Sequence, residues 1–88
     1  MPADDDLPAW LQRHRWDVGE RIRTLRHQRG LSQLQLAERI GVDVKTISRA
    51  ENGHYPISVD QLARIAYGLD VPSARLLPDD RPPGTAGR

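Results

Sequence analysis

The stretch of residues 32–53 restricts the fold more than any other part of the chain. It reads SQLQLAERIGVDVKTISRAENG and contains two helix-starting patterns on either side of a glycine. Ser32, with Gln35 three residues later, forms the pattern of a capping box, and Asp43 is a second N-cap residue. Gly41 lies between them and readily adopts the left-handed conformation that ends a helix. The pattern therefore predicts two short helices, residues 33–40 and 44–52, joined by a tight turn.

The second predicted helix has an outer face that solubility alone does not explain. Only Ile47 and Ala50 are spaced to face a core. The other side carries four different side chains: Val44, Lys45, Ser48 and Arg49. Together they offer positive charge, a hydroxyl group and methyl groups, and the major groove of DNA has partners for all three.

Length and composition favour one small helical domain. The chain has 88 residues and no cysteine, so disulfides and thiolate metal sites are excluded. Aromatic residues make up only 5% and Phe is absent, which predicts a core of Leu, Ile, Val and Ala. No apolar run approaches the roughly 20 residues of a membrane span. Three aspartates at positions 4–6 stand where a secretory signal needs positive charge. We therefore expect a cytoplasmic protein without membrane contact.

The net charge of +1 conceals a basic middle of the chain. Residues 13–54 hold nine Lys or Arg against five acidic residues, which leaves +4 in this segment. A solvated face with ion pairs explains such a bias as well as a polyanionic partner does. Charge alone therefore does not assign a function.

Two helices are predicted before residue 32. The first covers residues 7–15, with Asp6 as its cap and Pro8 in its first turn. The second covers residues 18–29 and starts at a capping box formed by Asp17 and Glu20. Its four arginines are expected on exposed sides, where they serve solubility: Arg21, Arg23, Arg26 and Arg29. At least one of two tryptophans is expected to pack against the domain, with contact to a partner as the alternative: Trp10 and Trp16.

Two further helices are predicted after residue 53. Ser58 and Gln61 form a third capping box, and the helix that follows ends at residues 68–70. Its apolar face is expected to contain Val59, Leu62, Ile65, Ala66 and Leu69. Pro72 then opens a short helix with Ala74, Leu76 and Leu77, which ends before Pro78.

These elements predict an all-α fold, a compact bundle of four to five short helices with an extra helix at the N-terminus. The domain is expected to cover residues 17–78. An N-terminal extension of residues 1–16, partly disordered and with a short helix, precedes it. A tail of residues 79–88 has no apolar content and is expected to be disordered.

Residues 18–77 resemble the phage-repressor and Cro-like (XRE-type) helix-turn-helix family of transcriptional regulators. The resemblance is carried by GERIRTLRHQRGLSQ, by Ala37 and Gly41 at the expected separation, by VKTISRAENG and by SVDQLARIAYGLDVP. It implies a lambda-repressor-like DNA-binding fold. In such a fold the helix of residues 33–40 rests across the DNA backbone, and the helix from Val44 to Asn52 enters the major groove.

The resemblance also implies roles for individual residues. Positions that contact base edges are filled by Val44, Lys45, Thr46, Ser48 and Arg49. Positions that contact phosphates are filled by Gln33, Arg26, Asn52, Gly53 and Tyr55. A third set is structural: Ala37, Gly41, Val42, Ile47, Ala50, Leu62 and Ile65.

Several of these roles have ordinary structural alternatives. Gln33 also reads as an exposed helix former, and Asn52 with Gly53 also reads as a helix C-cap. The hydroxyl groups of Thr46 and Ser48 serve the backbone of their own helix equally well.

One pair of matching positions links the first and third helices of the family fold. Arg26 and Glu51 match a salt bridge that would hold Arg26 toward DNA. Such a pair, if exposed, contributes at most about 1 kcal/mol, so its expected value is to aim Arg26.

Other positions leave two interpretations open. Leu34 stands where the family has a polar or small residue, so it covers N-terminal apolar surface or meets DNA sugar atoms. Four apolar residues near the last helix form either a two-fold contact or part of the core: Leu69, Val71, Leu76 and Leu77.

The leading hypothesis is a sequence-specific regulator of transcription, a repressor, that binds double-stranded DNA as a homodimer. The alternative is an antitoxin or accessory module of the same fold that binds a protein partner through the N-terminal extension. An enzyme is not expected, and neither a metal nor another cofactor is, because His14, His27 and His54 are scattered and no catalytic or metal-binding spacing occurs.

Overall fold

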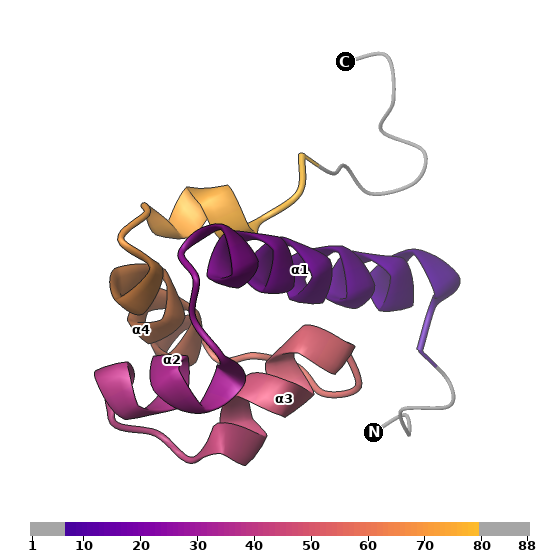
Figure 1. Ribbon diagram of the computed structural model, residues 1–88. Helices are drawn as coiled ribbons and strands as arrows, with labels where there is room; N and C mark the ends of the chain where they lie inside the picture. The colour runs from indigo at the N-terminus through magenta and orange to yellow at the C-terminus, as the bar shows by residue number, and fades with distance from the viewer. Residues whose placement is uncertain (1–6, 80–88) are drawn as a thin grey trace.

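The computed structural model describes residues 7–79. Its elements are α1 (Ala9–Gln28), α2 (Gln33–Ile40), α3 (Val44–Asn52), α4 (Val59–Leu69) and a 3-10 turn, η2 (Ser73–Leu76). Figure 1 shows the long α1 lying over α3, with α2 beside α3 and η2 on the opposite side of α1. The predicted all-α bundle is confirmed. The predicted disorder concerned parts of residues 1–16 and the tail of residues 79–88, and of these residues 1–6 and 80–88 lie outside the described residues.

The prediction of two separate helices before residue 30 is wrong, because α1 is continuous. Pro8 is its N-cap, and the Pro8 carbonyl accepts hydrogen bonds from the amides of Leu11 and Gln12 at 3.0 and 3.1 Å. The predicted cap residue Asp17 lies within α1 and is exposed. A residue suited to capping starts a helix only where the preceding backbone is not already helical. The predicted cap Asp6 lies outside the described residues.

A glycine within α1 permits close packing against α3. A Cβ atom added to Gly19 would lie 2.8 Å from the carbonyl oxygen of Ala50 and closer still to that of Glu51. Glycine is unfavourable inside a helix by up to about 1 kcal/mol relative to alanine. Its presence here is explained by the short distance between the two backbones.

The predicted turn between α2 and α3 is confirmed in detail. Ser32 Oγ accepts from the Gln35 amide at 3.0 Å, and the Ser32 amide donates to Gln35 Oε1 at 2.8 Å, which completes the capping box. Gly41 has a φ of 74°, in the left-handed region. Asp43 Oδ1 accepts from the Lys45 amide at 2.8 Å and caps α3.

The start of α4 is also capped as predicted, and its C-terminal end is held by arginines. Ser58 Oγ accepts from the amide of Gln61 at 3.0 Å. Arg29 Nε donates to the carbonyl of Leu69 at 2.7 Å, and Arg39 Nη1 donates to that of Gly68 at 3.1 Å. Cations at a helix C-terminus satisfy carbonyls that lack intrahelical partners. Arg29 therefore has a structural role that its predicted solubility role did not include.

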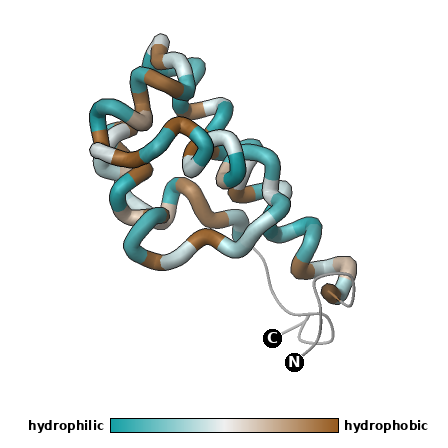
Figure 2. Tube along the Cα trace, turned by 90° about the horizontal axis from the view of Figure 1, so that it is seen from below, coloured by the Kyte–Doolittle hydropathy of each residue, from teal (hydrophilic) through white to brown (hydrophobic). Residues whose placement is uncertain are grey.

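Aliphatic side chains from every element form the core. Figure 2 shows hydrophobic residues interspersed among hydrophilic ones along the trace, as is expected of helices with one buried side. The buried hydrophobic residues are Val18, Ile22, Leu25, Leu36, Ala37, Ile47, Ala50, Ile65, Ala66, Leu69 and Leu76. None of the helices in residues 7–79 has the length and apolar character needed to cross a membrane.

Two predictions about the C-terminal half are corrected. Val59 does not join the apolar face of α4, because it lies about a quarter turn from the line of buried residues and is 82% exposed. The last helix is a 3-10 turn that ends at Leu76, with Pro72 as its N-cap, so Leu77 lies beyond it. Leu69 and Leu76 are fully buried and are not available for the two-fold contact. Their alternative interpretation, packing onto the core, is confirmed.

Candidate nucleic-acid interface

The outward face of α3 carries two exposed cations. Lys45 and Arg49 lie four residues apart and are both exposed, whereas Ile47 is fully buried on the opposite side. Val44, Thr46 and Ser48 are half-buried, and Val44 packs partly against the core. The predicted inward positions of Ile47 and Ala50 and the outward positions of Lys45 and Arg49 are confirmed. The outward position predicted for Val44 is corrected, because its side chain packs partly against the core. The base contacts themselves stay predictions.

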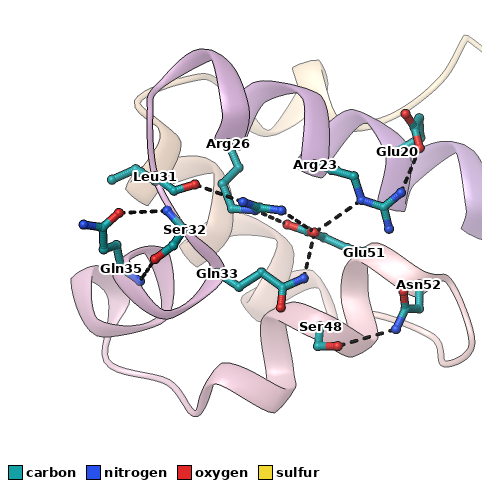
Figure 3. Close-up of polar contacts among 10 residues, drawn as sticks. All are labelled: Glu20, Arg23, Arg26, Leu31, Ser32, Gln33, Gln35, Ser48, Glu51 and Asn52. Atoms are coloured by element: carbon teal, nitrogen blue, oxygen red, sulfur yellow. Dashed lines mark hydrogen bonds and ion pairs between the residues drawn. The ribbon is translucent and has the colours of Figure 1, made fainter.

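A salt bridge between α1 and α3 lies beneath this face. Arg26 Nε donates to Glu51 Oε2 at 2.6 Å, and Nη2 donates to Oε1 at 2.9 Å (Figure 3). Arg26 Nη1 also donates to the carbonyl of Leu31 at 2.9 Å. The predicted pairing is confirmed, but the pair is buried: Arg26 is 7% exposed and Glu51 3%. The predicted phosphate contact of Arg26 stays a prediction. A buried guanidinium is better suited to holding α3 against α1 than to contacting DNA.

Two further side chains from α1 and α2 reach the same carboxylate. Gln33 Nε2 donates to Glu51 Oε1 at 3.0 Å. Arg23 Nε lies 3.6 Å from Glu51 Oε1, and Arg23 Nη1 lies 3.4 Å from Glu20 Oε1 (Figure 3). The Arg23 side chain is 39% exposed, so it is the solvent-facing cation of the group. Sequence reasoning missed this role, although three-residue spacing from Glu20 and from Arg26 was a signal for it.

The protonation states of the buried pair follow from these contacts. Burial alone would raise the pKa of Glu51, but hydrogen bonds from Arg26 and Gln33 and the charges of Arg26 and Arg23 outweigh it, so the pKa is lowered. The hydrogen bond to Glu51 raises the pKa of Arg26 against the opposing effect of burial. Both groups are therefore charged at neutral pH, and the carboxylate joins α1, α2 and α3.

The C-terminal end of α3 is held by the first turns of α1. Gly53 has a φ of 69°, and its amide donates to the carbonyl of Arg49 at 3.2 Å, so the predicted C-cap is confirmed. Gln12 Nε2 donates to the Gly53 carbonyl at 3.0 Å. A Cβ atom added to Gly53 would lie 2.7 Å from Trp16 Cδ1, so this tryptophan packs against the cap although it is 55% exposed. No local pattern marks Gln12, because 41 residues separate it from Gly53.

Two candidate phosphate-contacting residues flank this cap. Asn52 is exposed, and its Nδ2 donates to Ser48 Oγ at 3.5 Å (Figure 3). Tyr55 is 53% exposed, and the Arg49 guanidinium lies 5.5 Å from the centre of its ring. This distance is within the range of a cation–π interaction, which restrains Arg49 on the outer face of α3.

The histidine and acidic side chains do not form a metal centre in the described part of the chain. Within residues 7–79, no group of three or more His, Asp or Glu side chains could hold a metal ion. His27 and His54 are exposed, and His14 is half-buried on α1.

Comparisons with known proteins agree with this fold. A family model described as a helix-turn-helix domain matches residues 17–77. A putative HTH-type transcriptional regulatory protein of Pyrococcus furiosus is 41% identical over 54 residues, which cover 61% of this chain and 17% of that protein. The HTH-type transcriptional regulator PrpR of Mycobacterium tuberculosis is 31% identical over 71 residues, or 81% of this chain and 15% of PrpR. The chain thus spans less than a fifth of the length of these relatives.

Two solved structures match this chain over nearly their whole length. The restriction-modification controller protein C.AhdI from Aeromonas hydrophila has a TM-score of 0.68 and 32% identity, covering 70% of this chain and 94% of C.AhdI. The DNA-binding domain of BldD has a TM-score of 0.69 and 28% identity, covering 76% of this chain and 97% of that domain. The chain belongs to the XRE-like helix-turn-helix family of DNA-binding transcriptional regulators.

Proposed function

We propose that this chain recognises a specific double-stranded DNA sequence by placing α3 in the major groove. The observation that carries the proposal is the outer face of α3, on which Lys45 and Arg49 are exposed while the opposite face is fixed in the core. A helix held in this way presents its side chains to base edges in a fixed orientation.

Base readout is assigned to the exposed cations. Arg49 is long enough to donate two hydrogen bonds to guanine O6 and N7, and Lys45 can donate to the same acceptors. The half-buried Val44, Thr46 and Ser48 are placed to make shorter-range contacts, including one with a thymine methyl group.

Phosphate binding is assigned to groups at the edges of this face. Gln33 lies in the first turn of α2, where free backbone amides and the helix dipole favour an anion. Asn52, Gly53 and Tyr55 follow at the other end of α3. Arg23 is added because its side chain is the exposed cation of the Glu51 group. Leu34 on α2 is 53% exposed, which suits contact with sugar atoms.

The regulatory consequence is repression by occupancy, without a catalytic step. A dimer would place two copies of α3 on half-sites about one helical turn apart. Phosphate contacts would supply salt-dependent affinity, and the α3 side chains would supply the choice of sequence.

The experiment begins with selection of bound DNA from a random pool. In the Arg49→Ala variant, affinity for the selected site should fall about 5- to 150-fold, which corresponds to about 1–3 kcal/mol, while affinity for random DNA barely changes. Arg21→Ala is the matched control, since Arg21 is an exposed arginine on α1 outside the proposed interface. Equal losses on both DNAs would contradict base readout by Arg49.

A second candidate function, protein binding by the N-terminal part of α1, is favoured by one observation. Trp10 is 39% exposed and lies in α1 before the region that the family model covers. Trp10→Ala is a sharper test than deletion of residues 1–16, because deletion also removes the Gln12 contact with Gly53. Loss of a stoichiometric co-purifying partner in Trp10→Ala would support this function. The function would be contradicted if wild-type protein and Trp10→Ala both purify without a partner and bind the DNA site with equal affinity.

A further inference from the structure

An apolar stripe runs along the outer side of α4. Val59 and Tyr67 are 82% and 85% exposed, the largest exposed fractions among the large hydrophobic residues described. Ala63, which is also exposed, lies midway between them. Residues four apart lie on one side of a helix, so these three form a continuous stripe. The half-buried Ile40 at the end of α2 borders the same surface, next to Ala63 and Tyr67.

Opposite charges flank the stripe on one side. Asp60 and Arg64 are exposed and lie four residues apart, each one position after a stripe residue. Within residues 7–79, no ion pair or hydrogen bond joins either side chain to another residue of the chain. The flank therefore presents one unused negative and one unused positive group in a fixed order.

This pattern is complementary to itself under a two-fold rotation. Val59 and Tyr67 are each four residues from Ala63, about 6 Å along the helix axis in opposite directions. If a second α4 runs antiparallel with the two alanines facing, Val59 of each copy lies level with Tyr67 of the other. Asp60 then lies within about 3 Å, along the axis, of Arg64 from the other copy. The small side chain at the centre lets the two helices approach closely.

We propose that the outer stripe of α4 binds a second copy of this chain in this antiparallel arrangement. The charge order selects the occupant: a partner with charge of one sign would face a like charge at Asp60 or at Arg64, and an uncharged partner would leave both groups without a counter-charge. With a second copy, the Asp60 of each chain lies beside the Arg64 of the other, so all four charged groups gain a counter-charge. The same contact covers Val59 and Tyr67. None of these residues belongs to the proposed DNA interface. The inference rests on the proposed dimeric function and moves its contact from the buried Leu69 and Leu76 to the exposed side of α4.

The test is a charge exchange, followed by sedimentation equilibrium in the absence of DNA. Wild-type protein should sediment as a dimer of the 9.9 kDa chain. Asp60→Arg or Arg64→Asp alone places like charges opposite each other and should raise the dimer dissociation constant at least about tenfold. The double variant Asp60→Arg/Arg64→Asp restores the opposite pairs and should restore the dimer. Tyr67→Ala should weaken it as well, whereas Leu77→Ala, an exposed apolar residue elsewhere, should not.

Three results would overturn the proposal. Wild-type protein could stay monomeric at every protein concentration at which it is soluble, the single charge variants could dimerise as well as wild type, or the double variant could stay monomeric. Far-UV circular dichroism establishes that each variant is folded. Binding to DNA with one half-site and with two separates this proposal from the proposed function. The single charge variants should bind DNA with one half-site as tightly as wild type does. On DNA with two half-sites, they should lack the additional affinity that wild type gains from the second half-site. Wild-type protein that binds neither DNA would refute the DNA-binding function and leave the dimer result standing.

Discussion

Replacing Glu51 by alanine would leave the Arg26 guanidinium charged and without its carboxylate inside the fold. The Glu51 side chain has no exposed surface, and that of Arg26 is 9% exposed, so water cannot replace the lost carboxylate freely. Removing one partner of a buried ion pair typically costs about 3–5 kcal/mol. A domain of 88 residues has a total stability of about 4–13 kcal/mol. The variant should therefore lose about a quarter of its stability or more.

The loss can be measured by urea unfolding followed by far-UV circular dichroism. The midpoint should fall while the slope of the transition stays unchanged, and the melting temperature should drop by at least about 12 °C. Glu20→Ala is the matched control, because the ion pair of Glu20 with Arg23 is exposed and should contribute below about 1 kcal/mol. Leucine at both positions, Arg26→Leu/Glu51→Leu, should recover most of the loss. A Glu51→Ala cost as small as that of Glu20→Ala would refute the argument.

Three further predictions concern Glu51, the glycines at helix contacts and Tyr55. Because the pKa of Glu51 is lowered, its stabilising contribution is complete above about pH 4.3 and is lost as the pH falls through the lower folded value; acid titration of Glu51→Gln should lack this loss. Gly19→Ala should cost about 1–3 kcal/mol in urea unfolding, because its Cβ would meet backbone in α3. Gly68→Ala should also destabilise the fold, since its Cβ would lie 2.5 Å from Ile40 Cγ2 and 2.9 Å from Cδ1 of the fully buried Leu36. Tyr55→Ala should weaken binding of the selected DNA site by about 0.5–1 kcal/mol through the lost restraint on Arg49, whereas Tyr55→Phe keeps the ring and should lose only the proposed phosphate contact of the hydroxyl group.

Local chemistry explains which parts of the fold were predictable. The bounds of α2 and α3 follow from Ser32, Gly41 and Asp43, whose hydrogen bonds and backbone angles involve residues at most four apart. Asp17 carries the same signal within α1, but no turn precedes it, so the prediction of a helix start there was wrong. A capping pattern shows where a helix can begin, and the neighbouring backbone determines whether it does.

The parts that were not predictable depend on contacts between distant residues. Gln12 reaches Gly53, and Arg29 reaches the end of α4, across 41 and 40 residues of sequence. The pairing of Arg26 with Glu51 was expected only from the family resemblance, and its burial was not expected at all. Charged residues are seldom buried, so sequence alone favours an exposed pair.

Three contacts at successive levels fix the C-terminal half of α3 against α1. Gly19 allows the two backbones to approach, and Arg26 donates hydrogen bonds to Glu51. Gln12 donates to the carbonyl of Gly53, and Trp16 packs beside this glycine. The N-terminal end of α3 is fixed separately by its own Asp43 cap. Neither set of contacts uses the side chains of the outer face. Substitutions at Lys45 and Arg49 should therefore change which DNA sequence is bound without moving α3, so the position of the helix and its choice of sequence can change independently.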